Sequence, residues 1–169
     1  DMPIVSSDIK IRLSGGAANA NVNASLGGVK STVELVDATL HNLFDKVTSA
    51  EAAAGLVEYR CVYVHNGHAT LSLEDAKVFI ASNTPSPDTT LAIGVGTAAI
   101  NANEQTVANE ATAPSGVSFS EPATFAAGLT IGTLLPGQHK AIWLRRTISA
   151  GAAAVNDTAT FRVQGDTAP

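Results

Sequence analysis

The chain has 169 residues, with 10 Lys and Arg against 15 Asp and Glu and a formal net charge of -5. This length fits one domain, and the acidic balance argues against the basic surface that nucleic-acid phosphates require. Only 15% of the residues are charged and 29 are alanine, a composition that disfavours long charged helices and coiled coils.

The single cysteine, Cys61, allows no intramolecular disulfide, so the fold is expected to form without one. No apolar run approaches the roughly 18 residues of a membrane-spanning helix, and the first residues lack the basic and apolar segments of a signal peptide. These features predict a soluble protein made in a reducing compartment, with no membrane partner and no nucleic-acid partner.

Hydrophobic alternation with a period of two predicts strands along most of the chain. Near the N-terminus it predicts strands over residues 9–13 and 31–36, separated by a Gly-, Ala- and Asn-rich stretch (residues 15–28) that is expected to form a long surface loop. The one predicted helical segment lies near residues 40–54, where apolar residues recur at helical spacing and an alanine run ends at Gly55.

The most regular strand is predicted over residues 57–64. One of its faces carries two tyrosines and the cysteine, whereas the other begins charged and ends apolar. That change is expected of a strand that runs from a sheet margin into an interior covered on both sides. The Asn66-Gly67 pair that follows favours a two-residue hairpin, because both central positions of a type I′ turn need a positive φ.

The second half of the chain continues in short strands and turns. Residues 70–81 are predicted to be the hairpin partner, with a bulge or break at Glu74-Asp75 where the phase of the alternation changes. Residues 97–114 are expected to form a loop. The remaining strands are expected at residues 91–95, 117–119, 129–134, 141–148 and 158–164, with a turn at residues 135–138.

This succession of short strands predicts an all-β fold, an antiparallel β-sandwich that is jelly-roll-like, with one short helical insertion near residues 40–54. We expect an extended N-terminal arm over residues 1–8, followed by a single β-sandwich domain over residues 9–169.

His65 and His68 flank the predicted Asn66-Gly67 turn, so a two-residue hairpin would place their imidazoles opposite each other. Two imidazoles so placed are weak candidates for a transition-metal site, which needs a third or fourth ligand that the neighbouring sequence does not supply. The alternative, which we favour, is a pair of polar residues at an exposed loop tip, and no metal site is predicted.

No set of residues predicts catalysis or cofactor binding. The carboxylates lack the spacing of a paired acid and base, and no Ser, Cys or Asp accompanies a histidine at the spacing of a nucleophile and its base. Cys61 lies mid-strand among apolar residues, where a buried small hydrophobe is expected rather than a reactive thiolate. We therefore predict no catalytic residues, no cofactor and no enzymatic activity.

The one local concentration of arginines in the sequence consists of Arg145, Arg146 and Arg162. If their strands are adjacent, these side chains form a contact patch for an acidic partner. The alternative is that they are ordinary solvated residues on strand faces.

Four segments resemble the central strands of small virion proteins of tailed bacteriophages. They are residues 58–66, 71–80, 135–146 and 161–166. In that class, a strand of the form Tyr-Arg-Cys-hydrophobic leads into an Asn-containing turn, and a later Pro-Gly turn feeds a Trp-containing strand that ends in basic residues. The chain is thus similar to capsid decoration, or cement, proteins with a β-sandwich or jelly-roll fold.

The resemblance implies a non-enzymatic structural protein that binds and stabilises the outer surface of a phage head. The implied partner is the major capsid protein lattice, with self-association as a dimer or trimer. The implied location is the virion, after synthesis in the bacterial host cytoplasm. Two alternatives remain: a tail or baseplate accessory module, and a carbohydrate-binding adhesion sandwich, which needs exposed aromatic platforms.

Overall fold

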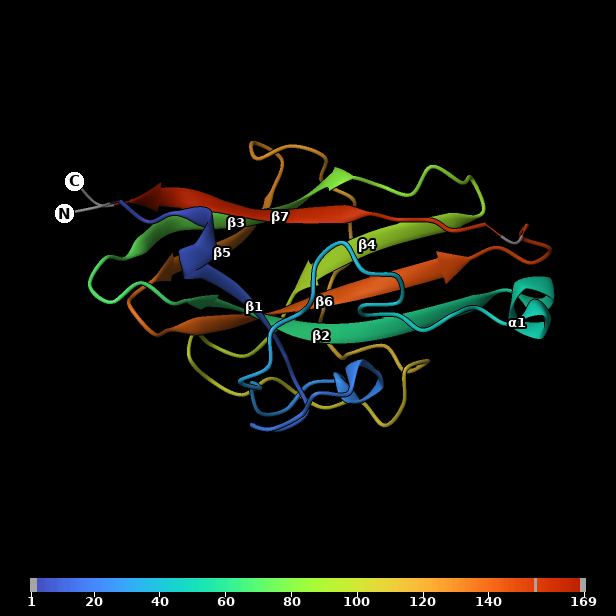
Figure 1. The fold of residues 1–169 in the computed structure, drawn as a ribbon, viewed down its shortest axis with the longest axis horizontal. Helices are drawn as coiled ribbons and strands as arrows, with labels where there is room; N and C mark the ends of the chain where they lie inside the picture. The colour runs from blue at the N-terminus through green and yellow to red at the C-terminus, as the bar shows by residue number, and fades with distance from the viewer. Residues whose placement is uncertain (1–2, 154, 168–169) are drawn as a thin grey trace.

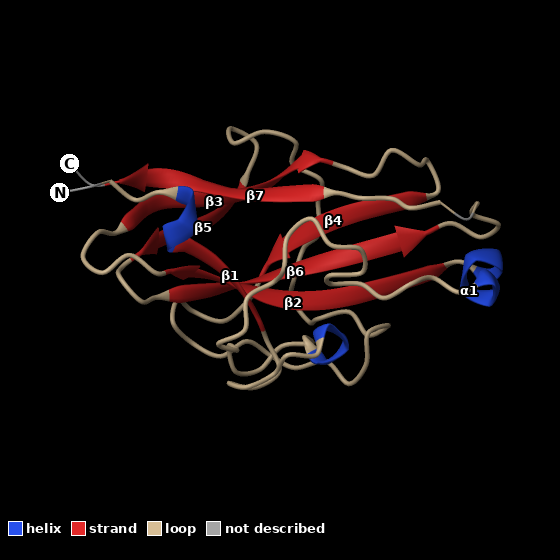
Figure 2. Ribbon diagram, in the orientation of Figure 1, coloured by secondary structure: helices blue, strands red, loops and turns tan. Residues whose placement is uncertain are grey.

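The computed structural model describes residues 3–153 and 155–167. They form an antiparallel sandwich of two sheets with long loops and one short α-helix (Figures 1 and 2). The strands are β1 (Ile9–Leu13), β2 (Leu56–Asn66), β3 (Leu73–Ser82), β4 (Thr89–Val95), β5 (Leu129–Leu134), β6 (His139–Ile148) and β7 (Thr160–Thr167). The helical elements are the 3-10 turns η1 (Ser6–Asp8) and η2 (Val22–Ala24) and the helix α1 (Ser49–Ala54).

The strand order is β1-β2-β6-β4 in the larger sheet and β5-β3-β7 in the smaller one. From β2 onward, each successive strand lies in the opposite sheet, so the chain passes back and forth between the two layers as it does in a jelly roll. The all-β, jelly-roll-like sandwich predicted from the sequence is therefore confirmed.

The inner core lies between the two sheets. The larger sheet contributes alternate residues of β2 and β6, including Val62, Val64 and Leu144, and the smaller sheet contributes Val78 and Ile80 of β3. These side chains lie on one face of each strand because successive residues of a strand point to opposite faces.

The outer face of the larger sheet carries a second core. Its buried members are Tyr59, Cys61, Tyr63, Val107, Ala141 and Trp143. The loops that follow β1 and β4 cover this face, and in Figure 1 they gather below β2 as blue and yellow traces. The larger sheet is therefore buried on both faces, as the unbroken apolar end of β2 predicted.

The predicted helical insertion is correct only in its second part. The helix α1 begins after Thr48, whose hydroxyl accepts a hydrogen bond from the Glu51 amide while the Glu51 carboxylate accepts one from the Thr48 amide. Residues 40–47 are not helical, because His41 has a φ of 57° and Leu43 is drawn into the interior at 5% exposure. Burial of one side chain thus overrides the helical spacing.

The strand predicted over residues 31–36 is reduced to an isolated bridge between Arg12 and Glu34. The segment does run beside β1, since the Leu13 amide donates to the Val33 carbonyl. The ladder is interrupted because the Thr32 amide donates to Ala17 in the neighbouring loop instead. The strand predicted over residues 117–119 is likewise absent from the described residues, and only a bridge between Ile93 and Ser120 forms there.

The predicted Asn66-Gly67 hairpin is wrong, because β2 and β3 belong to different sheets. Asn66 is fully buried, and its carboxamide donates to the carbonyls of Leu71 and Leu134, both at 2.9 Å. The asparagine therefore ties the β2–β3 connection to β5 rather than forming a tight turn.

Other predicted features are confirmed. The register of β3 shifts between Leu73 and Ala76, and Asp75 has a φ of 48°, which is the expected bulge. The strands expected near residues 91–95, 129–134, 141–148 and 158–164 correspond to β4 to β7.

The N-terminal arm was expected over residues 1–8, of which 1–2 lie outside the described residues. Within the remainder, Ile4 packs against the inner core, and the Asp8 carbonyl accepts a hydrogen bond from the Gly67 amide at 2.7 Å. In the described part of the chain, no helix has the length and apolar character needed to cross a membrane.

Candidate functional site

Two arginines and three carboxylates form a network at the α1 end of the larger sheet. Arg146 on β6 and Glu58 on β2 are register partners, and the Arg146 Nε donates to Glu58 Oε2 at 3.0 Å. The same guanidinium group donates to the Asp45 carbonyl at 2.9 Å. Burial raises the pKa of Glu58, and this effect outweighs the opposing charge of Arg146.

Arg60 is the second cation of this network and is completely buried. Its guanidinium group donates to the Leu43 carbonyl at 3.1 Å, to Asn23 Oδ1 at 3.0 Å and to Glu110 Oε2 at 2.8 Å. The Phe44 ring lies beside both cations, with its centroid 5.3 Å from the Arg60 Cζ and 4.8 Å from that of Arg146. The network therefore fastens the loops that follow β1 and β4 to β2 and β6.

Oxygen atoms of Asp45, Glu58 and Glu110 all lie within 4.8 Å of one another, a spacing that suits a metal ion. Arg60 already pairs with Glu110, and Arg146 pairs with both Asp45 and Glu58, so we interpret the cluster as an ion-pair network. Sequence reasoning missed it, because its members come from two strands and two loops.

The three arginines predicted as a contact patch do not come together, because β6 and β7 lie in different sheets. Arg146 points into the sandwich toward Glu58. Arg145 lies on the opposite face of β6, with its Cζ 5.1 Å from the centroid of the Phe119 ring, and Arg162 lies on β7, with its Cζ 6.0 Å from that of Phe79. The adjacent-strand assumption behind the patch is wrong.

His65 and His68 do not oppose each other across a hairpin. The His68 Nδ1 accepts hydrogen bonds from the amides of Thr70 at 3.1 Å and Leu71 at 2.9 Å, which holds this imidazole within its own loop. The cross-strand partner of His65 is instead His139 on β6. Within the described residues, no histidine belongs to a cluster of three or more potential metal ligands.

Cys61 is fully buried in the outer core, as predicted from its place in the strand. Burial raises the pKa of its thiol far above the ordinary range. The hydroxyls of Ser14 and Ser25 donate to its backbone carbonyl at 2.7 and 2.6 Å. These bonds fix the loop that follows β1, called the first loop below, onto β2.

Tyr63 joins the two loops that cover the outer core. Its hydroxyl donates a hydrogen bond to the Gly28 carbonyl of the first loop. It also accepts one at 2.9 Å from the Glu104 amide of the second loop, which follows β4. Burial raises the pKa of Tyr63 to about 12. The alternation in β2 predicts which face Tyr63 occupies, but no local signal predicts its partners.

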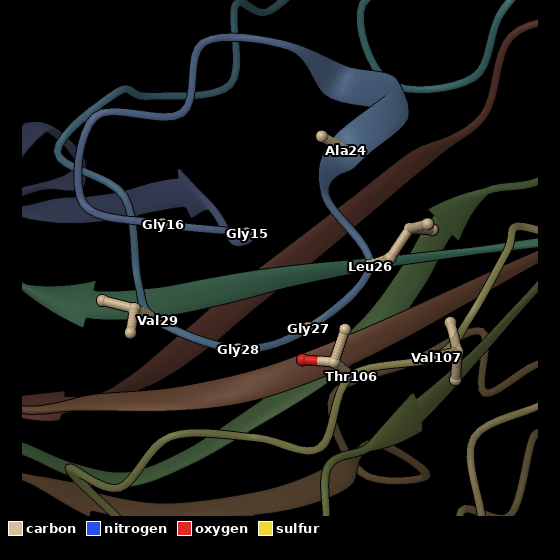
Figure 3. Close-up of a pocket in the computed structure, with 9 residues that line it drawn as sticks. All are labelled: Gly15, Gly16, Ala24, Leu26, Gly27, Gly28, Val29, Thr106 and Val107. Atoms are coloured by element: carbon tan, nitrogen blue, oxygen red, sulfur yellow. The ribbon is translucent and has the colours of Figure 1, made fainter.

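A shallow pocket of about 390 Å³ lies where these two loops meet (Figure 3). Its lining residues are Gly15, Gly16, Ala24, Leu26, Gly27, Gly28, Val29, Thr106 and Val107. Gly27 has a φ of 101°, and a Cβ there would overlap the Gln105 carbonyl oxygen. None of the lining side chains is titratable, so the pocket offers apolar and backbone contacts rather than acid–base or nucleophilic chemistry.

Comparisons of the chain with protein-family models, curated protein sequences and solved structures give no match.

Proposed function

We propose that the chain is a non-enzymatic structural protein of a tailed-bacteriophage virion that binds the outer surface of the major capsid protein lattice and reinforces it. The observation that carries the proposal is that buried charged and phenolic side chains of the protein form hydrogen bonds that hold its own loops and strands together. Arg60 and Arg146 hold loops against the larger sheet, and Tyr63 joins the two covering loops. These side chains stabilise the fold by holding the loops against the sheet.

The layer of loops over the outer core supports the same proposal. Long loops ordinarily move, yet these are fixed to β2 through the carbonyl of Cys61 and the hydroxyl of Tyr63. A pre-ordered surface loses less conformational entropy when a partner binds. A protein that reinforces a shell benefits from this rigidity.

The carbohydrate-binding alternative is less compatible with the burial of the aromatic residues. Sugar stacking needs an exposed aromatic face. Trp143 and Tyr63 are completely buried and Tyr59 is 9% exposed. The large hydrophobic side chains that are exposed in the described part of the chain are all aliphatic: Val5, Val29, Val36, Leu40, Val57, Leu135 and Val155.

Self-association as a dimer or trimer belongs to the proposal. Among the described strands, β7 pairs only with β3, so it lies at the edge of the smaller sheet. Its other edge is free to pair with a strand of a second copy of the chain. Sedimentation analysis of the purified chain over a range of concentrations tests this part, since a species that stays monomeric throughout contradicts it.

The main test is the copy number of the chain in purified virions, measured by quantitative mass spectrometry against the major capsid protein. A shell component is expected in hundreds of copies, distributed over the head in a reconstruction of the particle. A handful of copies, or density confined to the tail, favours the baseplate alternative. Absence from virions rejects every virion assignment.

A functional control uses particles stripped of the chain. Re-addition of the wild-type chain is expected to restore resistance of the heads to heat or osmotic shock. If stripped and restored heads burst equally, the chain is not a cement protein, whatever its copy number.

A further inference from the structure

A second group of charged residues lies on the outer face of the larger sheet, away from the Arg146 network. Lys10, His65 and His139 occupy one row across β1, β2 and β6, because Lys10 pairs with His65 and His65 pairs with His139. Directly opposed residues of neighbouring strands have Cβ atoms roughly 5 Å apart. Arg12 follows Lys10 on the same face of β1.

Lys30 completes the group from the first loop. Its neighbours fix it there, since the Ser31 amide donates to the Leu13 carbonyl at 2.8 Å and the Gly16 amide donates to the Val29 carbonyl at 3.0 Å. We call this set the cationic cluster, which comprises Lys10, Arg12, Lys30, His65 and His139.

The charges of the cationic cluster are poorly balanced within the protein. Among the described residues, the one carboxylate paired with it is Glu34, at 3.7 Å from the Lys10 Nζ and 3.9 Å from an Arg12 nitrogen. Three permanent cations against one carboxylate leave a net charge of +2 when the imidazoles are neutral. Burial and the Arg12 charge lower the pKa of Lys30, which is the response of a cation without a sufficient counter-charge.

Three nitrogens of the cluster are buried without a hydrogen-bond partner among the described residues. They are Arg12 Nε, His65 Nδ1 and His139 Nε2. Buried polar atoms in proteins are ordinarily paired. Arg12 Nε always carries a proton and needs an acceptor, whereas the two imidazole nitrogens donate when their rings are protonated. The cluster therefore points to an acceptor from outside the chain. An oxyanion supplies such acceptors, and a dianion matches the net charge.

We propose that the cationic cluster binds a dianionic oxyanion, of which inorganic phosphate is the simplest form. Among the described residues, the Glu34 carboxylate also faces the site, as does the Tyr63 ring, which meets the His139 ring edge-on with 5.0 Å between centroids. The Thr32 carbonyl accepts a hydrogen bond from Arg12, and a backbone hydrogen bond with Ala102 favours the protonated form of His139. Tyr63 is uncharged at neutral pH because its pKa is about 12. It therefore does not oppose an anion.

The imidazoles make the binding depend on pH. Burial and the Lys30 and Arg12 charges lower the pKa of His65 to about 4, and burial and Lys30 lower that of His139. A bound anion favours the protonated forms, so it raises both pKa values. Affinity for sulfate, which stays dianionic, is therefore expected to increase as the pH falls from about 7 to about 5.

The test is an NMR titration of the isotopically labelled full chain with inorganic phosphate, sulfate and, at matched ionic strength, sodium chloride and sodium acetate. Phosphate and sulfate are expected to give saturable shifts of the His65 and His139 imidazole signals and of the Arg12 Nε–H. Lys30→Gln is expected to weaken sulfate binding at least about tenfold, because it removes one charge-assisted contact. Lys46→Gln, at an exposed lysine outside the cluster, is the matched control and should bind as wild type does.

Lys10→Gln is a second variant, so the test does not depend on the folding of Lys30→Gln alone. It is expected to lose affinity while its thermal midpoint without anion stays near the wild-type value. Any one of three results overturns the proposal: shifts that do not saturate, equal responses to acetate and sulfate, or unchanged affinity in both folded cluster variants. Because the readout is the isolated chain, that outcome is independent of whether the chain occurs on a phage head.

Discussion

Glu58 and Arg146 face each other across β2 and β6, and the guanidinium group of Arg146 also reaches Asp45 in the loop before α1. The side chain of Glu58 is only 5% exposed. A carboxylate at this depth needs its partner, because desolvation of an unpaired charge is far less favourable than desolvation of a pair. The pair therefore couples the stability of the sheet to the position of the loop.

Arg146→Met tests this coupling. The variant leaves the Glu58 carboxylate buried without its guanidinium partner, and we expect a loss of about 3 kcal/mol in the free energy of unfolding at neutral pH. Because burial raises the pKa of Glu58 in the folded state, the folded variant binds a proton more readily than the unfolded chain. Its stability therefore falls as the pH rises above the unfolded value of about 4.3.

The measurement is urea denaturation of the variant and the wild-type protein at about pH 5 and pH 7. The difference between them is expected to be smaller at the lower pH. Arg162→Met is the matched control, because Arg162 is exposed on β7 and its loss should change stability by less than about 1 kcal/mol. An equal loss at both pH values contradicts the assignment of the effect to Glu58.

Gly27 and Gly16 separate the effect of close loop contact from the effect of backbone conformation. Both have a positive φ, 101° for Gly27 and 128° for Gly16. A Cβ at Gly27 overlaps the backbone of Gln105, whereas a Cβ at Gly16 has no neighbour within 4 Å. We expect Gly16→Ala to lose about 1 kcal/mol from backbone strain and Gly27→Ala to lose about 3 kcal/mol or more.

Guanidinium denaturation of the two variants provides the comparison. Equal losses would mean that the first and second loops are not in contact in solution at Gly27. A larger loss for Gly27→Ala supports the packed loop layer that lines the pocket in Figure 3.

Alternation along the chain predicted β1 to β7 and the two-faced burial of β2, because both depend on local side-chain periodicity. It also predicted strands over residues 31–36 and 117–119, where only isolated bridges form. It did not predict the pairing. The Asn66-Gly67 sequence is a strong hairpin signal, yet the buried Asn66 carboxamide donates a hydrogen bond to the carbonyl of Leu134, which is 68 residues away. Long-range hydrogen bonds of this kind are invisible to a local pattern.

The same limit applies to the charged sites. Arg60 was expected near a sheet margin, whereas it is fully buried with partners 17 and 50 residues away at Leu43 and Glu110. The cationic cluster was missed because its residues are too far apart in sequence to form a run. The arginines that do form a run, Arg145 and Arg146, point to opposite faces of β6 because neighbouring residues of a strand must do so.

Cys61 provides a probe of the outer core. Because burial raises the pKa of its thiol, no thiolate forms at moderately alkaline pH in the folded protein, and we expect no reaction with a thiol-specific reagent on the time scale of mixing. One equivalent should react after unfolding. Ala69→Cys places a thiol at an exposed position and should react at once. Rapid labelling of Cys61 in the folded wild type is incompatible with a closed loop layer.

Tyr63 and Tyr59 form a matched pair for testing how the loop layer is held. Tyr63→Phe leaves the Gly28 carbonyl and the Glu104 amide without their partner, and we expect a loss of about 2–3 kcal/mol. The Tyr59 hydroxyl makes no hydrogen bond with the residues that the structure describes, so Tyr59→Phe should change stability by less than about 0.5 kcal/mol.

The pH dependence of stability separates the contribution of the Tyr63 hydroxyl, which titrates, from that of the packing of its ring, which does not. The folded pKa of about 12 lies above the unfolded value of about 10, so the stabilisation is present below about pH 10 and is lost as the pH rises toward 12. Tyr63→Phe removes this dependence, whereas Tyr59→Phe retains it. Denaturation of the three proteins between about pH 8 and pH 11 measures the difference. Parallel curves for wild type and Tyr63→Phe would mean that the phenol is not held between the two loops, and the layer over the outer core would then need another anchor.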